Sequence, residues 1–132
     1  MWVMVSSTHV PVDPVAGLTP TALRAFDLFG EAARVAYGDK LVKLVLFGSR
    51  SRGDARLNSD IDVAVVLREL HDRRADRDQL ADLAYDAIVE TCMDVHALPV
   101  SLDEWEHPEH HTNPALIRTI KREGVVWPLA AR

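Results

Sequence analysis

Two short apolar segments separated by a polar loop constrain the fold most strongly. Residues 41–47 and 60–67 are rich in leucine and valine, and the second segment opens with two acids. Segments of this length and composition are typical of strands buried in a sheet, whereas a helix needs about ten residues or more. The sequence therefore predicts two strands that flank one turn-rich, basic loop at residues 48–59.

Helical patterns surround these strands. Thr19-Pro20 is an N-cap followed by proline in the first turn, and apolar residues then recur at helical spacing until Gly38. Further elements are expected at residues 72–90 (helix), 93–98 (strand), 101 onward (a short helix opened by a capping box), 113–124 (helix) and 125–127 (edge strand). This order predicts an α+β fold with α/β character, in which helices pack on a small mixed sheet.

Length and charge limit the domain organisation and the classes of function that this chain can have. The 132 residues, of which 48% are apolar, suit one globular domain, expected at 19–132 after an irregular arm at 1–18. The net charge of −5 argues against a protein that holds nucleic acid through its overall charge, so stable nucleic-acid binding is not expected. The first lysine or arginine is Arg24, so the positively charged start of a signal peptide is missing, and no apolar stretch approaches about twenty residues. We therefore expect a cytoplasmic protein outside the membrane.

Asp60 and Asp62 are the first candidate site residues. Because side chains alternate across a strand, both carboxylates project from one face while Ile61 points into the core. Two charges about 4 Å apart repel by roughly 4 kcal/mol at an effective dielectric of about 20, which favours a cation between them. Hard oxygen ligands suit Mg²⁺ or Mn²⁺, and such ions complete their shell with water and phosphate, so a nucleotide is the expected third component. The alternative is a pair of solvated acids at a strand end.

The loop before these acids has the residues of a phosphate-binding turn. Gly48 follows a buried strand and allows close backbone approach, and Ser49 is placed to open a nest of N–H groups. Arg50, Arg52 and Arg56 add local positive charge to an acidic protein. One or two of these arginines, with Arg50 and Arg52 as the candidates, are expected to contact phosphate, the alternative being surface solubility.

Asp94 is the third candidate carboxylate. It is flanked by Met93 and Val95 in an expected apolar strand, where burial without a partner is costly and a nearby metal ion would satisfy it. If this strand lies next to the one with Asp60, the carboxylates could hold a pair of ions, and Asp94 could accept the proton of an attacking hydroxyl. His96 shares the face of Asp94 and could touch the site, although a packed or solvent-facing histidine is the favoured interpretation.

Together these residues resemble a known family. Gly48-Ser49, ten intervening residues, Asp60-x-Asp62 and a later Asp94 resemble the nucleotidyltransferase superfamily related to DNA polymerase beta. The short chain resembles the minimal members of that superfamily, the MNT-domain proteins. The resemblance covers about residues 20–128 and includes the closing segment from Asn113-Pro114 to Gly124-Val125.

The resemblance implies a nucleotidyltransferase fold and an enzyme that transfers AMP from ATP to an acceptor hydroxyl with release of pyrophosphate. By position, Asp60 and Asp62 match the metal-binding pair and Asp94 matches the carboxylate that completes the site and activates the acceptor. Gly48 and Ser49 match the phosphate-binding turn. Because all five residues are present, an active enzyme that depends on Mg²⁺ or Mn²⁺ is expected.

The resemblance also implies an acceptor. Minimal members are typically antitoxins paired with a HEPN-domain ribonuclease toxin, which predicts AMP transfer to a tyrosine hydroxyl of such a toxin within a complex of the two proteins. Two alternatives stay open. An aminoglycoside-type enzyme would need a substrate domain or a dimer that completes the site. An antitoxin that acts by binding alone would still neutralise its partner after replacement of Asp60 or Asp62.

Overall fold

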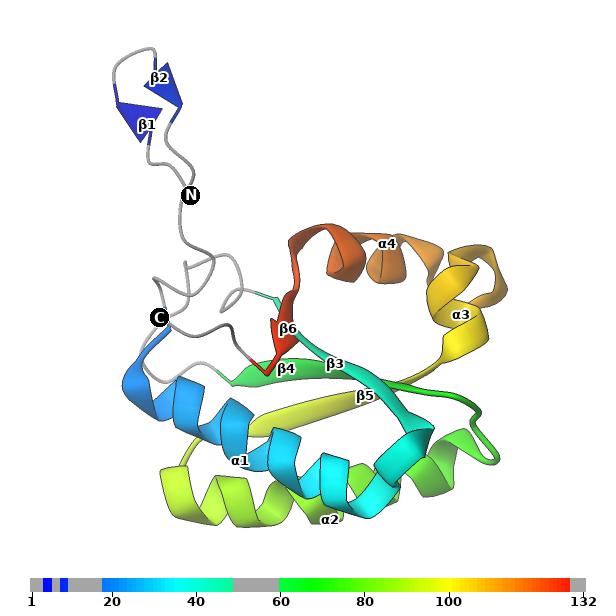
Figure 1. The fold of residues 1–132 in the computed structure, drawn as a ribbon, viewed down its shortest axis with the longest axis horizontal. Coiled ribbons are helices and arrows are strands. Elements are labelled where there is room, and N and C mark those ends of the chain that lie inside the picture. The colour runs from blue at the N-terminus through cyan, green and yellow to red at the C-terminus, as the bar shows by residue number, and fades with distance from the viewer. Residues whose placement is uncertain (1–3, 6–7, 10–17, 49–59, 129–132) are drawn as a thin grey trace.

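The computed structural model of the chain describes residues 4–5, 8–9, 18–48 and 60–128 (Figure 1). The helices are α1 (Pro20–Tyr37), α2 (Arg73–Thr91), α3 (Leu102–Glu106) and α4 (Pro114–Glu123), with short 3-10 turns at Gly38–Lys40 and Pro108–His110. The strands are β1 (Met4–Val5), β2 (Thr8–His9), β3 (Leu41–Phe47), β4 (Ile61–Leu67), β5 (Val95–Ser101) and β6 (Val125–Trp127). In the N-terminal arm, β1 and β2 pair antiparallel, and most of the other residues lie outside the described part of the chain.

Strands β3 to β6 form one mixed four-stranded sheet in the order β5-β4-β3-β6. Strand β3 is antiparallel to both β4 and β6, whereas β4 and β5 run parallel. The predicted mixed sheet with packed helices is therefore confirmed, and β6 lies at an edge as expected. The other edge is β5.

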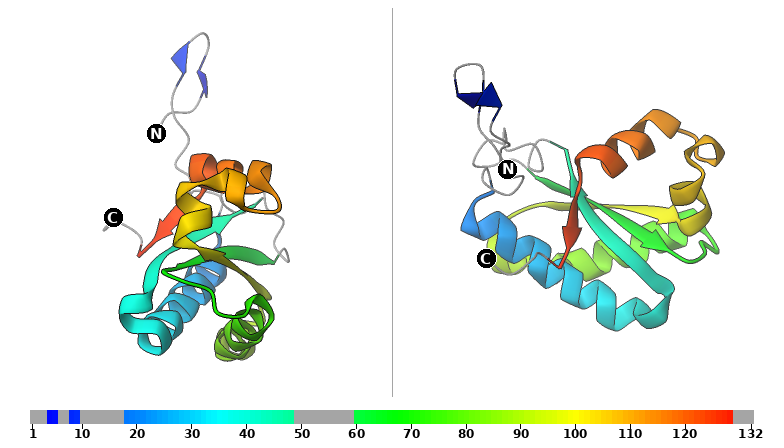
Figure 2. Two further views of the ribbon diagram at one scale, coloured as in Figure 1. Left: turned by 90° about the vertical axis from the view of Figure 1, so that its right-hand side faces the viewer. Right: turned by 45° about the horizontal axis from the view of Figure 1, so that its top comes forward.

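Helices cover both faces of the sheet (Figures 1 and 2). Ile61, Val63 and Val65 of β4 belong to a core cluster shared with α1 and α2. Ala64 and Val66, which alternate with them, belong to a second cluster shared with α3 and α4. Burial on both faces explains why β4 is a continuous apolar run and not an alternating pattern.

The predicted helix caps are present. The Thr19 side chain accepts from the Ala22 N–H, and Asn113 accepts from the Leu116 N–H. Ser101 and Glu104 form a reciprocal capping box at the start of α3. Among the described residues, no helix combines the length and the apolar character needed to cross a bilayer.

The third predicted strand needs a correction. It spans Val95–Ser101 and not residues 93–98, because Cys92 ends α2 in the left-handed region and the strand continues through Pro99. Proline is tolerated there since β5 is an edge strand, where an outward-facing position needs no N–H donor. Asp94 therefore lies just before the strand and is exposed, so the argument from costly burial was wrong.

Candidate active site

The acidic residues meet at one edge of the sheet, where β4 and β5 begin and β3 ends. Strands β4 and β5 are parallel, so their first residues lie side by side, and the end of the antiparallel β3 reaches the same edge. The Ile61 N–H donates to the Asp94 carbonyl at 3.0 Å, and Asp62 stands opposite His96 in the register. The topology thus brings together residues that are more than thirty positions apart in the chain.

Asp60, Asp94 and His96 form the centre of this site. Each offers one potential ligand atom, and these atoms all lie within 4.8 Å of one another. The His96 Nε2 and Asp60 Oδ2 atoms are 2.8 Å apart, which is hydrogen-bond distance. All three residues are exposed, so a ligand from solvent can reach them.

Asp62 occupies a different environment. Its side chain is half-buried, and it stands outside the group formed by Asp60, Asp94 and His96. Partial burial raises the pKa of the Asp62 carboxyl above its ordinary value, since the charged form loses hydration. The charge of His96 lowers this pKa and that of Asp60 raises it. Asp62 is therefore an acid whose charged form is only partly solvated.

Gly48 lies against Asp62 at the end of β3. Its φ of +84° is a conformation that side-chain-bearing residues rarely adopt, and a Cβ at this position would lie 2.9 Å from Asp62 Oδ2. The backbone conformation thus favours the glycine expected from sequence, and any side chain here would have to displace the Asp62 carboxylate. The other predicted phosphate-binding residues, Ser49, Arg50 and Arg52, lie outside the described residues.

The donor set fits a divalent cation. Asp60 and Asp94 offer hard carboxylate oxygens, and His96 offers an imidazole nitrogen. Oxygen donors suit Mg²⁺ and Mn²⁺, and imidazole is compatible with a transition-metal ion such as Mn²⁺. Sequence reasoning did not select His96, although its position two residues after Asp94 already placed both on one face.

A groove of about 440 Å³ adjoins the site. Its walls come from β5, α2 and α4, with contributions from the end of β3 and the start of β4. The lining residues are Phe47, Asp62, Arg77, Ala81, Val95, His96, Ala97, Leu98 and Leu116. Because Asp62 and His96 belong to both, the groove and the site form one continuous surface.

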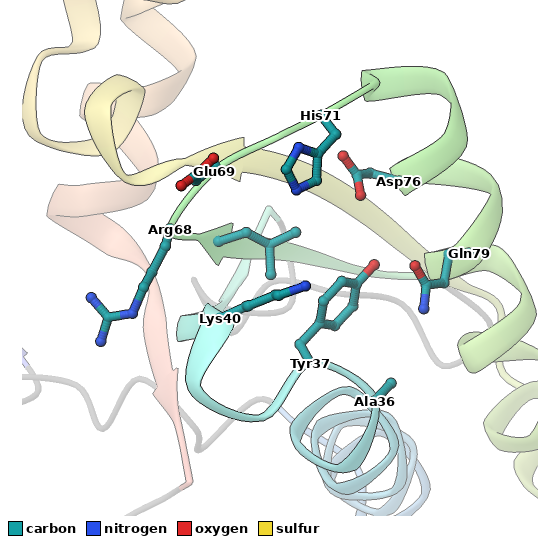
Figure 3. Close-up of a pocket in the computed structure, with 9 residues that line it drawn as sticks. Ala36, Tyr37, Lys40, Arg68, Glu69, His71, Asp76 and Gln79 are labelled. Carbon is teal, nitrogen blue, oxygen red and sulfur yellow. The ribbon is translucent and has the colours of Figure 1, made fainter.

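A second hollow of about 390 Å³ lies near the other end of β4 (Figure 3). Tyr37, Lys40 and Asp76 contribute to its lining. The Tyr37 hydroxyl and Asp76 Oδ2 are buried there, and neither has a hydrogen-bond partner among the described residues. This hollow contains none of the predicted site residues.

Comparison with known proteins gives a family and a fold. Residues 33–126 match the family described as nucleotidyltransferase domain. A Methanocaldococcus jannaschii protein named as a putative protein adenylyltransferase is 41% identical over 51 residues, which are 39% of this chain and 35% of that protein. The match therefore spans about a third of that relative's length.

Two crystal structures are similar in fold. A toxin–antitoxin with AMP-PNP aligns with a TM-score of 0.56 at 24% identity, covering 79% of this chain and 73% of that one. The toxin–antitoxin MntA-HepT aligns with a TM-score of 0.51 at 21% identity, covering 80% and 71%. At these identities the likeness supports the fold of the chain.

Proposed function

Because the chain belongs to the nucleotidyltransferase domain family, we propose that it transfers AMP from ATP to a hydroxyl group of a partner protein. The observation that carries this proposal is the convergence of Asp60, Asp94 and His96 beside Asp62. Acids gathered at one exposed site repel one another unless a cation binds there, and phosphoryl chemistry uses such a cation. The local similarity to an adenylyltransferase supports a protein acceptor.

The proposed reaction balances as a single displacement. The acceptor oxygen forms a bond to the α-phosphorus of ATP, and the bond from that phosphorus to the bridging oxygen of the β-phosphate breaks. Pyrophosphate leaves, and the hydroxyl proton passes to a carboxylate, for which exposed Asp94 is the candidate. The product is an AMP group joined to the acceptor through a phosphodiester.

The cation-binding residues proposed for this reaction are Asp60, Asp62 and Asp94. A bound Mg²⁺ or Mn²⁺ would neutralise charge on the phosphate oxygens. His96 contacts Asp60 and holds that carboxylate in one orientation at the rim of the site. A bound cation would also give half-buried Asp62 a counter-charge that offsets its lost hydration.

The proposed phosphate-binding residues are Gly48, Ser49, Arg50 and Arg52. The positive φ of Gly48 turns the chain sharply at the end of β3, next to Asp62. Backbone N–H groups after such a turn are suited to bind phosphate oxygens, and the arginines supply charge. We place the whole activity in a domain at residues 19–132, with residues 1–18 as a separate arm.

The proposed acceptor is a tyrosine hydroxyl of a HEPN-domain ribonuclease toxin, and the chain would act as its antitoxin. Support comes from the fold, which is shared with chains of crystallised toxin–antitoxin complexes, one of them with the ATP analogue AMP-PNP. AMP on the toxin would neutralise its activity.

Mass spectrometry tests the proposal directly. The purified protein is incubated with labelled ATP and Mg²⁺, with and without a candidate HEPN-domain partner. We expect the partner to gain the mass of AMP, and we expect Asp60→Asn and Asp62→Asn to abolish the gain. Asp39→Asn, an exposed acid at the far end of β3, is the matched control and should transfer normally. Neutralisation without added mass would contradict the proposal and leave an antitoxin that acts by binding.

A further inference from the structure

Within the described part of the chain, no strand pairs with the outer side of β5 next to the candidate active site. In a parallel ladder, the N–H and C=O of one residue point to the same side, and successive residues point to opposite sides. The Asp94 carbonyl accepts from Ile61 of β4, so His96 and Leu98, two and four residues further on, also face β4. The backbone groups of Val95 and Ala97 therefore face away from the sheet.

A contact further along β5 supports this assignment. Arg73 Nη1 donates to the Pro99 carbonyl at 2.9 Å, so that carbonyl faces α2 and not β4. Arg73 is held in place by Glu104, whose Oε2 atom is 2.7 Å from Arg73 Nη2. Proline has no N–H, so the outward backbone groups at Pro99 are already accounted for. As far as the structure describes the chain, the stretch of this edge that stays open is the one at Val95 and Ala97.

The edge of β5 thus has a covered half and an open half. An open edge can pair with another strand, and proteins commonly protect it. Here Pro99 and Arg73 protect the half of β5 that is remote from the site. Among the described residues, no comparable contact covers the half that adjoins Asp94 and His96.

The groove follows this open half. Val95 and Ala97 face the α1 and α2 side with Arg77 and Ala81 of α2, while His96 and Leu98 lie on the other face with Leu116 of α4. A groove that includes residues from both faces of an edge strand passes along that edge. Its lining combines apolar side chains with the charged Arg77 and the polar His96, beside the outward backbone groups of Val95 and Ala97, and this combination fits an extended polypeptide.

We propose that the acceptor protein docks through an extended segment that pairs with β5 at Val95 and Ala97. Main-chain hydrogen bonds provide the affinity in this mode of recognition, and alternate side chains provide the specificity. A side chain of the segment that faces the same side as His96 then lies next to Asp60, where the acceptor hydroxyl is needed. Arg77 is placed to bind an acidic residue of the segment. The inference rests on the proposed transferase function.

Ala97→Pro is the first test. It removes one outward N–H and leaves the ladder to β4 intact, and Pro99 shows that this register accepts proline. We expect kcat/KM for the acceptor protein to fall at least about tenfold, with ATP affinity within about twofold of the original. Ala97→Ser changes the side chain and keeps the amide, so the difference between the two variants isolates the N–H. Normal transfer by folded Ala97→Pro would overturn the docking proposal.

Hydrogen exchange of the unmodified protein is the second test and does not depend on how the proline variant folds. We expect the acceptor protein to slow exchange of the Val95 and Ala97 amides, and Mg²⁺ with ATP alone to leave them unchanged. Protection by nucleotide alone, or no protection by the acceptor, would overturn the docking proposal.

The two proposals fail in different ways. Protection of these amides by an acceptor that gains no AMP refutes the transferase function and retains the docking surface. AMP transfer without protection refutes the docking surface and retains the function.

Discussion

The His96 imidazole lies 2.8 Å from the Asp60 carboxylate and thereby connects the beginnings of two parallel strands. Asp60 precedes β4 directly, and His96 is the second residue of β5. The register that sets Asp62 opposite His96 brings the imidazole to the acidic end of β4. A histidine in this place can orient the carboxylate or share a cation with it.

His96→Ala should weaken both cation binding and transfer. Loss of a group that orients a metal-binding carboxylate typically costs about 10–100-fold in metal affinity or activity. We expect a loss of this size in Mn²⁺ affinity, measured by calorimetry, and in the rate of AMP transfer. His71→Ala is the control, because this exposed histidine lines the second hollow at the other end of β4. Unchanged Mn²⁺ affinity in His96→Ala would contradict the role.

Asp62→Asn should make the metal-free protein more stable while abolishing transfer. Burial raises the pKa of Asp62, which means that its charged form carries a desolvation cost, and the neutral amide removes that cost. We expect the melting temperature without metal to rise by about 1–3 °C, which is the usual direction at a strained functional site. A lower melting temperature would mean that the charge at Asp62 stabilises the fold.

Gly48→Ala should destabilise the domain by about 1–2 kcal/mol, since alanine at a positive φ is strained and its Cβ would meet Asp62. Gly38→Ala is the matched control: Gly38 also has a positive φ, but a Cβ there has no neighbour within 4 Å. Urea denaturation of both variants separates backbone strain from the contact. Equal losses in the two would contradict a specific fit between Gly48 and Asp62.

The helix starts could be predicted well from the sequence, because the residues that define them are close together in the chain. Each helix start has a capping side chain that accepts a hydrogen bond from an N–H three residues further on, at Thr19, Ser101 and Asn113. The strand predicted at residues 93–98 stopped short of Pro99, whose place inside the observed strand depends on β5 being an edge. Edge position is a property of the assembled sheet and is absent from the local pattern.

The candidate site was predictable in its acids but not in its full composition. Two signals pointed to Asp60 and Asp62: their spacing in a strand, and the resemblance of the segment from Gly48 to Asp62 to the nucleotidyltransferase superfamily. His96 was visible only as one histidine on the face of Asp94, and its contact with Asp60 depends on which strands pair and in what register. The sequence also grouped Asp60 with Asp62, whereas the closest group in the described residues contains Asp94 and His96 instead of Asp62.

Glu104→Gln should lower stability at neutral pH and flatten its dependence on acid. Burial alone would raise the pKa of Glu104. The hydrogen bonds from Arg73 and from the Ser101 N–H together lower it by more than burial raises it, so the net shift of the pKa is downward. Because the carboxyl pKa is lower in the folded state, its charged form stabilises the fold at pH values above the ordinary pKa of 4.5. This stabilisation is lost as the pH falls through the folded-state pKa.

The expected loss for Glu104→Gln is about 1 kcal/mol at pH 7, after allowance for the exposure of Arg73. Urea denaturation between pH 7 and pH 3 should show the two proteins converging in stability as the pH falls. Glu69→Gln, an exposed change outside this cluster, serves as the control. A constant difference across the pH range would show that the ionised carboxylate is not the stabilising group.

Tyr37→Phe should leave the domain equally stable or stabilise it by up to about 1 kcal/mol. The Tyr37 hydroxyl is buried without a partner among the described residues, so its removal relieves a desolvation cost and breaks no hydrogen bond there. Burial, followed by the charge of Asp76, raises the pKa of Tyr37 above 10.0. The folded protein therefore holds this proton more tightly, and stability should fall as pH rises through that range in the original protein but less in the variant. Urea denaturation at pH 7 and above pH 10 checks both expectations, and a loss of more than about 1 kcal/mol at pH 7 would reveal a bound water or ligand on the hydroxyl.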